Sequence, residues 1–214
     1  MLRARHLLPF IALAAFLDFA AAAAAQTIID DWSNIKAPPA PELTSVTVDP
    51  KTTALLMLDF LNKNCTPNPR CVASLPIAQK LLAAARENGL TVVHTNFTGG
   101  DISPEVARKD TEPLITASVD KFVLTSKDGS QDTGLDKILK DKGVKTVIVV
   151  GSAANGAVLY TASSAVFRGY QTIVPVDGMS GKNAYVEQEV AYNFVSAPVI
   201  GGKVILTRVD MIKY

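Results

Sequence analysis

Continuous apolar runs alternate along this chain with segments whose apolar residues recur at helical spacing. Residues 53–61 read TALLMLDFL and residues 146–150 read TVIVV, and such runs are typical of central parallel strands covered on both faces. Shorter apolar runs predict further strands at residues 90–97, 172–176 and 204–209, and residues 114–125 contain strand-like sequence around Phe122-Val123-Leu124.

Helical spacing predicts the connections between these strands. The expected helices begin at Ser74, at Thr133 or Asp132, at Asn155 and near Ala184, with Pro76 in the first turn of the first one, and a short helix is expected at 105–109. Strands that alternate with helices form right-handed βαβ units. The sequence therefore predicts the α/β class, as a three-layer α/β/α sandwich with a mainly parallel, Rossmann-like central sheet.

The beginning of the chain has the features of an export signal. Arg3 and Arg5 precede an apolar stretch from Leu7, and three alanines ending at Ala25 form a small-residue cleavage pattern. A transmembrane anchor is the alternative, although Asp18 interrupts the stretch. We expect a signal peptide at 1–25, a proline-containing arm at 26–50, one domain at 51–214, and a periplasmic or secreted bacterial protein without membrane association after cleavage.

The charge balance gives little support to nucleic-acid binding. The chain has 21 lysines and arginines against 20 aspartates and glutamates, and no basic patch interleaved with aromatic residues.

Two cysteines and two histidines restrict the available chemistry. Two interpretations of Cys65 stay open: a disulfide with Cys71, which export and the short spacing favour, and a reactive thiol. His6 lies in the predicted signal, so a zinc site built on several histidines is excluded and no metal is expected. His94, near a strand end, is either a hydrogen-bonded residue at the sheet edge or a substrate contact.

Polar residues at two strand ends indicate where a site would lie. Asp59 is the only charged residue in its apolar strand, and Gly151 ends a later strand. Crevices in open parallel sheets lie beyond the carboxyl ends of the strands. If the two strands are neighbours, Asp59 and the 151–157 turn face one cleft; a structural cap at a strand end is the alternative role for Asp59.

Several segments together resemble the isochorismatase-like (cysteine hydrolase) superfamily. LLMLDF at 55–60 is similar to the family's first-strand motif, whose aspartate is catalytic. GSAANGAVLYTASSAVFRGY at 151–170 is similar to the GxxTNxCVxxTAxxAxxxGY signature, and IVPVDGM at 173–179 to the strand that follows. The resemblance spans residues 53–177.

The resemblance implies a set of site residues and no cofactor. Family members place a cysteine thiolate at a helix N-terminus, beside an aspartate base and a lysine. Here Asp59 matches the aspartate, and Lys121 is preferred to Lys127 for the lysine, with solvated surface lysines as the alternative. A turn through Ser152, Ala153 and Asn155 would bind an oxyanion through the N–H groups of Ala153 and Ala157, with a cis bond at Ser152-Ala153.

The chain departs from the family pattern at the nucleophile, because Ala157 stands where most members have cysteine. Without a heteroatom it cannot form an acyl-enzyme, and neither Ser152 nor Thr161 has a base beside it in the sequence. Isochorismatases proper also have a small residue there, and they cleave a vinyl ether with a general acid, a role that Asp59 would fill if burial raised its pKa.

Three functional hypotheses follow. The first is an exported hydrolase that cleaves a C–N amide or vinyl-ether bond of a small molecule, with Asp59 as acid or base. The second is a binding protein that kept the cleft, and the third is an engineered cysteine-to-alanine form of an amidohydrolase. The metal-binding nicotinamidase branch and a dinucleotide-binding turn do not fit, and the resemblance leaves self-association open.

Overall fold

The computed structural model describes residues 27–97, 99–126 and 129–214, which fall into two units, 1–37 and 38–214. The described part of the first unit holds one short helix, α1 (Ile28–Asp31), where the Thr27 N–H donates to Asp30 Oδ2 over 2.8 Å. The predicted signal peptide at 1–25 lies outside the described residues.

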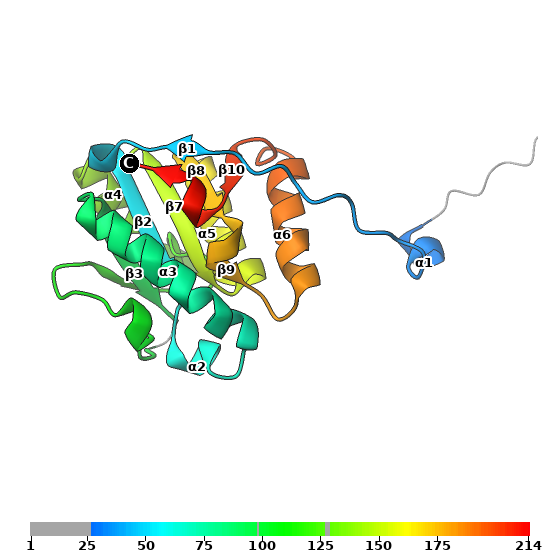
Figure 1. Ribbon diagram of the computed structural model, residues 1–214, viewed down its shortest axis with the longest axis horizontal. Helices are drawn as coiled ribbons and strands as arrows, with labels where there is room; N and C mark the ends of the chain where they lie inside the picture. The colour runs from blue at the N-terminus through cyan, green and yellow to red at the C-terminus, as the bar shows by residue number, and fades with distance from the viewer. Residues whose placement is uncertain (1–26, 98, 127–128) are drawn as a thin grey trace, which may run out of the picture. The chain divides into compact units, whose positions relative to one another are not determined.

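A parallel sheet forms the centre of the second unit, with the spatial order β10-β8-β7-β2-β3-β4 and β9 paired with β7 (Figure 1). Its strands are β2 (Thr53–Leu58), β3 (Thr91–Asn96), β4 (Leu114–Thr116), β7 (Thr146–Ser152), β8 (Gln171–Pro175), β9 (Met179–Ser180) and β10 (Val204–Thr207). The pairing of β2 with β7 runs from Thr53–Thr146 to Leu58–Gly151. The two apolar runs are therefore neighbours in the sheet.

Alternate residues of the central strands enter two separate cores. In β2, Leu56 and Leu58 pack on one face of the sheet, whereas Leu55 and Met57 pack on the other. Successive side chains of a strand point to opposite faces, so a strand that is apolar at every position needs cover on both. This arrangement confirms the predicted mainly parallel sheet flanked by helices.

Helices supply that cover. α3 packs on one face, and α4, α5 and α6 contribute to the core on the other (Figure 1). The helices of this unit are α2 (Asn62–Cys65), α3 (Pro69–Glu87), α4 (Leu135–Asp141), α5 (Leu159–Phe167) and α6 (Ala184–Ser196). No helix among the described residues combines the length and the apolar character needed to cross a membrane.

The predicted start of α3 at Ser74 is wrong. Asn68 is the N-cap and its side chain accepts the Arg70 N–H, while Pro69 occupies the first helical position. An asparagine cap followed by proline is itself a strong start signal. Pro76 consequently lies inside the helix.

Other predicted helix starts also shift. Gly134, with φ of +85°, is the N-cap of α4 in place of Thr133 or Asp132, whose side chains instead accept N–H groups from Leu135 and Gly134. The segment expected to begin at Asn155 opens with a π-helical turn, Ala154–Val158, that follows Ala153 and leads into α5. The short helix expected at 105–109 is a 3-10 turn, Pro104–Val106.

Two smaller sheets lie outside the sequence-based expectations. The segment 114–125, where strand-like sequence was expected around Phe122-Val123-Leu124, holds β4 and the beginning of β5 (Val123–Ser126). β5 forms an antiparallel hairpin with β6 (Gly129–Asp132). β1 (Val46–Thr47) pairs with β11 (Ile212–Lys213), so this part of the 26–50 segment contacts the end of the chain.

Candidate active site

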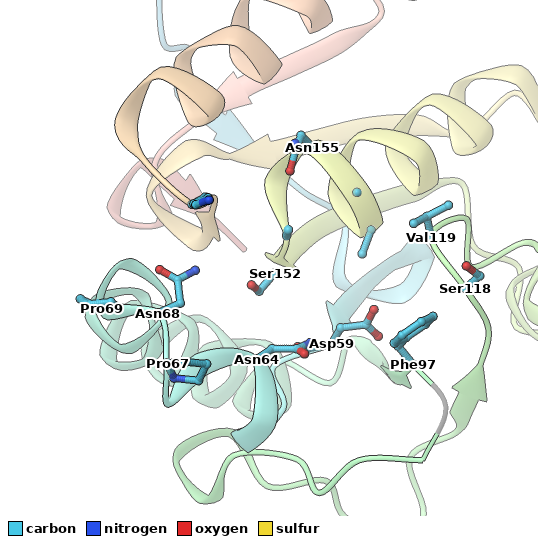
Figure 2. Close-up of a pocket in the computed structure, with 14 residues that line it drawn as sticks. Asp59, Asn64, Pro67, Asn68, Pro69, Phe97, Ser118, Val119, Ser152 and Asn155 are labelled. Atoms are coloured by element: carbon cyan, nitrogen blue, oxygen red, sulfur yellow. The ribbon is translucent and has the colours of Figure 1, made fainter.

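A cavity of about 600 Å³ opens beyond the carboxyl ends of β2, β3 and β7. Asp59 and Ser152 lie between the segment that carries Pro67 and Asn68 and the loop that carries Val119 (Figure 2). The sequence prediction that Asp59 and the turn after Gly151 face one cleft agrees with this geometry.

Gly151 lets the two central strands converge at this point. An added Cβ at Gly151 would lie 2.2 Å from the carbonyl oxygen of Leu58, far inside van der Waals contact. Because Leu58 precedes Asp59 and Gly151 precedes Ser152, the close approach sets the carboxyl group and the turn side by side. Glycine is required here for the contact between the two backbones.

Asp59 is held by several hydrogen bonds, as a buried carboxyl group requires, and its side chain is only 7% exposed. Thr95 Oγ1 donates to Oδ1 over 2.7 Å, and Asn64 Nδ2 donates to the backbone carbonyl over 3.1 Å. The residue has φ of +50°, which is uncommon outside glycine but tolerated by aspartate. These contacts fix the direction of the carboxyl group relative to the cavity.

Lys121 reaches the same carboxyl group from a distant part of the chain. Its fully buried Nζ lies 2.7 Å from Asp59 Oδ2, and it also donates to the carbonyls of Ala117, over 2.9 Å, and Ser118. All three ammonium protons thus have acceptors. Of the two predicted lysines, Lys121 faces Asp59, whereas Lys127 lies outside the described residues.

Burial shifts the titration of both partners. Loss of hydration raises the pKa of Asp59, although Lys121 and Thr95 act in the opposite direction. Burial likewise lowers the pKa of Lys121, against the attraction of Asp59. Both shifts favour the uncharged forms, so they bring the pKa values of the two groups closer together.

The turn above the carboxyl group carries the remaining predicted site residues. The Ser152-Ala153 peptide bond is cis, as predicted. Ser152 and Ala157 are buried and line the cavity, while Ala153 and Asn155 line it from more exposed positions. The Ala157 side chain is a methyl group, which has no proton to give and no lone pair.

The two cysteines form a disulfide, Cys65–Cys71, and this selects one of the two interpretations left open by the sequence. Cys65 ends α2 and Cys71 lies in the first turn of α3. Between them, Pro67, Asn68 and Pro69 line the cavity. The bridge therefore closes a loop that forms one wall of the site.

His94 is separate from this cavity. It is buried in β3, which has β2 and β4 on its two sides, so the expected position at the sheet edge is wrong. Its Nε2 lies 3.0 Å from Glu112 Oε2, and Glu112 also binds Arg86. Burial lowers the pKa of His94 to about 4.

Sequence reasoning missed four residues that shape the site. Thr95 could have been found from the topology, because it lies near the carboxyl end of β3, the strand beside β2. Asn64, Asn68 and Lys182 lie in connections without a distinctive pattern. Among the described residues, no cluster of three or more histidine, cysteine or acidic side chains has the arrangement of a metal site.

Comparison with known proteins gives a consistent result. The family model described as "Isochorismatase domain" matches residues 53–207. Maleamate amidohydrolase from Pseudomonas putida is 33% identical, over 56% of this chain and 68% of that protein.

Solved structures share the fold at low identity. N-carbamoylsarcosine amidase from Thermoplasma acidophilum has a TM-score of 0.62 at 20% identity, covering 74% of this chain and 97% of that one. A cysteine hydrolase from Pseudomonas syringae pv. phaseolicola has a TM-score of 0.67 at 18% identity, covering 79% of this chain and 94% of that one.

Proposed function

Because the chain belongs to the isochorismatase domain family, we propose that it is a small-molecule hydrolase that uses Asp59 as its acid-base group. Ala157 then occupies the position at which cysteine hydrolases of the family carry their nucleophile. One observation carries this function: the buried Asp59–Lys121 pair lies at a cavity of about 600 Å³, a size suited to a small molecule. A raised pKa places the Asp59 carboxyl nearer to the pH at which acid-base catalysis is efficient.

Cleavage of an amide C–N bond is the first candidate reaction, since the 33% identical relative is named an amidohydrolase. With alanine at position 157, water must attack in place of a thiolate. Asp59 takes one proton from that water, and the water oxygen bonds to the carbonyl carbon of the amide. The C–N bond then breaks as the nitrogen accepts a proton. The products are a carboxylate and an amine, and no covalent enzyme intermediate forms.

The turn supports this reaction by stabilising the developing oxyanion. The first N–H groups of a helical turn have no partner within it and point toward its N-terminal side. Gly156 and Val158 donate to the Ala153 carbonyl over 3.0 and 3.3 Å, which holds the turn Ala154–Val158 in place. We assign oxyanion binding to the N–H groups of Ala153 and Ala157.

Vinyl-ether cleavage is the second candidate, favoured by the raised pKa of Asp59 together with the small residue at 157. Here protonated Asp59 donates to the terminal alkene carbon, water adds to the resulting oxocarbenium carbon, and the hemiketal separates into a ketone and an alcohol. The two reactions have opposite pH dependences. Amide cleavage needs ionised Asp59 and weakens as pH falls through its pKa, whereas vinyl-ether cleavage needs the protonated form and weakens as pH rises.

We also propose that the protein is exported and acts in the periplasm or outside the cell. The arginine-containing, alanine-rich beginning of the sequence supports this, and so does the Cys65–Cys71 bridge, because disulfides persist in oxidising compartments. Recovery of a chain that begins at Gln26 from the periplasm or medium would support export. Retention of the intact chain in the cytoplasm would contradict it.

The function is tested by incubating the protein with small amides and a vinyl ether such as isochorismate, and following products by mass spectrometry. We expect turnover that falls at least about a hundredfold in Asp59→Asn, the usual range for a lost acid-base group. Asp177→Asn is the matched control, because Asp177 is partly buried and does not line this cavity. Ligands that bind but are recovered intact would instead support a binding protein.

A further inference from the structure

Taking the proposed hydrolase function as given, we infer that its substrate is a carboxylate and that the Lys182 ammonium recognises that carboxylate at the rim of the cavity. Two charged residues, Asp59 and Lys182, line the cavity among the residues that the structure describes. The charge of Asp59 is balanced by Lys121 over 2.7 Å. The remaining formal charge among these lining residues is therefore the single positive charge of Lys182.

Among the residues that the structure describes, Lys182 has no competing acidic partner. No carboxylate in the described part of the chain lies within ion-pair distance of its Nζ. Asp177 and Glu187 are the acids nearest in sequence. Glu187 binds Arg70 with both oxygens and also accepts the Gly181 N–H over 2.9 Å, while Asp177 Oδ1 accepts the Val209 N–H over 3.0 Å. The ammonium group is exposed and available to a ligand.

The backbone on both sides of Lys182 is fixed. Gly181 donates to Glu187 and its carbonyl accepts from Asn68 Nδ2 over 3.2 Å. An added Cβ at Gly181 would lie 2.9 Å from a Val186 methyl carbon, so this loop packs tightly. Asn183 caps α6 by accepting the Val186 N–H over 3.0 Å. An anchored backbone reduces the ordering cost of a bond between Lys182 and a ligand.

The other cavity residues explain why a monocarboxylate fits better than a phosphate or a neutral compound. The side-chain amides of Asn64 and Asn68 already donate hydrogen bonds to the carbonyls of Asp59 and Gly181. Phe97, Val119 and two prolines add apolar surface to the cavity. A single ammonium matches one negative charge, whereas a phosphate monoester carries close to two. The carboxylate end of the substrate would meet Lys182, with the scissile bond at Asp59.

Binding to matched probes tests this inference without requiring turnover. The full-length protein is titrated calorimetrically with succinamate and neutral succinamide, and with 4-carbamoylbenzoate and neutral terephthalamide. We expect each carboxylate to bind about tenfold more tightly than its neutral partner, the scale of one charge-assisted hydrogen bond. That preference should disappear in Lys182→Gln, persist in Lys182→Arg, and weaken as salt is added.

Lys203→Gln is the matched control because it removes one exposed lysine directly before β10, at the opposite end of the parallel strands. It should retain the preference. Equal binding of charged and neutral probes by the unmodified protein, an unchanged preference in Lys182→Gln, or no saturable binding of either carboxylate would overturn the inference. If the unmodified protein prefers carboxylates but turns over no substrate, the result would count against the hydrolase function and leave carboxylate recognition supported.

Discussion

Lys121 Nζ lies 2.7 Å from Asp59 Oδ2, although 62 positions separate the two residues in the chain. The lysine side chain is fully buried and the aspartate side chain is 7% exposed. The attraction between two buried charges offsets the free-energy cost of their desolvation only when the remaining donors and acceptors of both groups are also hydrogen-bonded. Ala117, Ser118 and Thr95 provide those partners.

Lys121→Met is expected to destabilise the fold by about 3 kcal/mol, because it leaves a buried carboxyl group without its partner. Urea denaturation measures the change. Lys137→Met is the control: its pair with Asp141 is exposed on α4, and its loss should cost about 0.5 kcal/mol. Similar small losses in both variants would show that the buried pair does not support the fold.

Gly151→Ala should both destabilise the protein and impair the site. The added methyl group meets the Leu58 carbonyl at 2.2 Å, so β2 and β7 must separate and Asp59 must move. We expect a loss of about 3 kcal/mol or more, the range of a severe clash in the core. Gly143→Ala is the control, since Gly143 also has positive φ but no neighbour within 4 Å, and should cost about 1 kcal/mol.

His94 should make the fold sensitive to acid. Its pKa of about 4 in the fold lies below the usual 6.5, so the unfolded chain binds more protons between these values. The contribution of neutral His94 to the free energy of unfolding is complete above pH 6.5. It is lost as pH falls toward 4, by up to about 3 kcal/mol.

Denaturation of the unmodified protein and His94→Gln across that pH range isolates this contribution. The variant should lose less stability between pH 6.5 and 4 than the unmodified protein. The pKa of Glu112 is also lowered, so the stability that its ionised form contributes is lost only as pH falls below its ordinary value of 4.5. Parallel pH profiles would contradict the assignment to His94.

The Cys65–Cys71 bridge should stabilise both the fold and one wall of the cavity. Replacing both cysteines by alanine is expected to cost about 2 kcal/mol, the value for a short closed loop. Ligand affinity should fall as well, because Pro67, Asn68 and Pro69 lie within that loop. A stability loss with unchanged affinity for the carboxylate probes would show that the bridge serves the fold alone.

The central sheet was predictable because burial on both faces leaves a strong mark on sequence. β2 and β7 are buried at every position and rich in apolar residues, and Asp59 is the only charged residue in the run at 53–61. Strand polarity places Asp59 at the carboxyl edge of the sheet, and the pairing of β2 with β7 brings it to the same cleft as the turn after Gly151. The alternation of strands and helices along the chain likewise predicted the three-layer arrangement.

Local boundaries and long connections were harder to predict. Asn68 and Pro69 form as good a helix start as Ser74, and sequence does not rank two adequate caps. Lys121 reaches Asp59 through a loop whose path depends on tertiary contacts, including its N–H bond to Thr161. Lys182 is an exposed lysine in a short connection, and only the folded geometry shows that it lines the cavity.

Hydrolysis without a cysteine nucleophile is tested by comparing the protein with its Ala157→Cys variant on the same amide and vinyl-ether panel, with intact-protein mass spectrometry. We expect the unmodified protein to turn over a substrate without forming a covalent adduct. Activity that appears only in Ala157→Cys, together with an acylated protein mass, would contradict it. The cleft would then be complete except for its nucleophile, and ligand binding would be the function of the chain with alanine at 157.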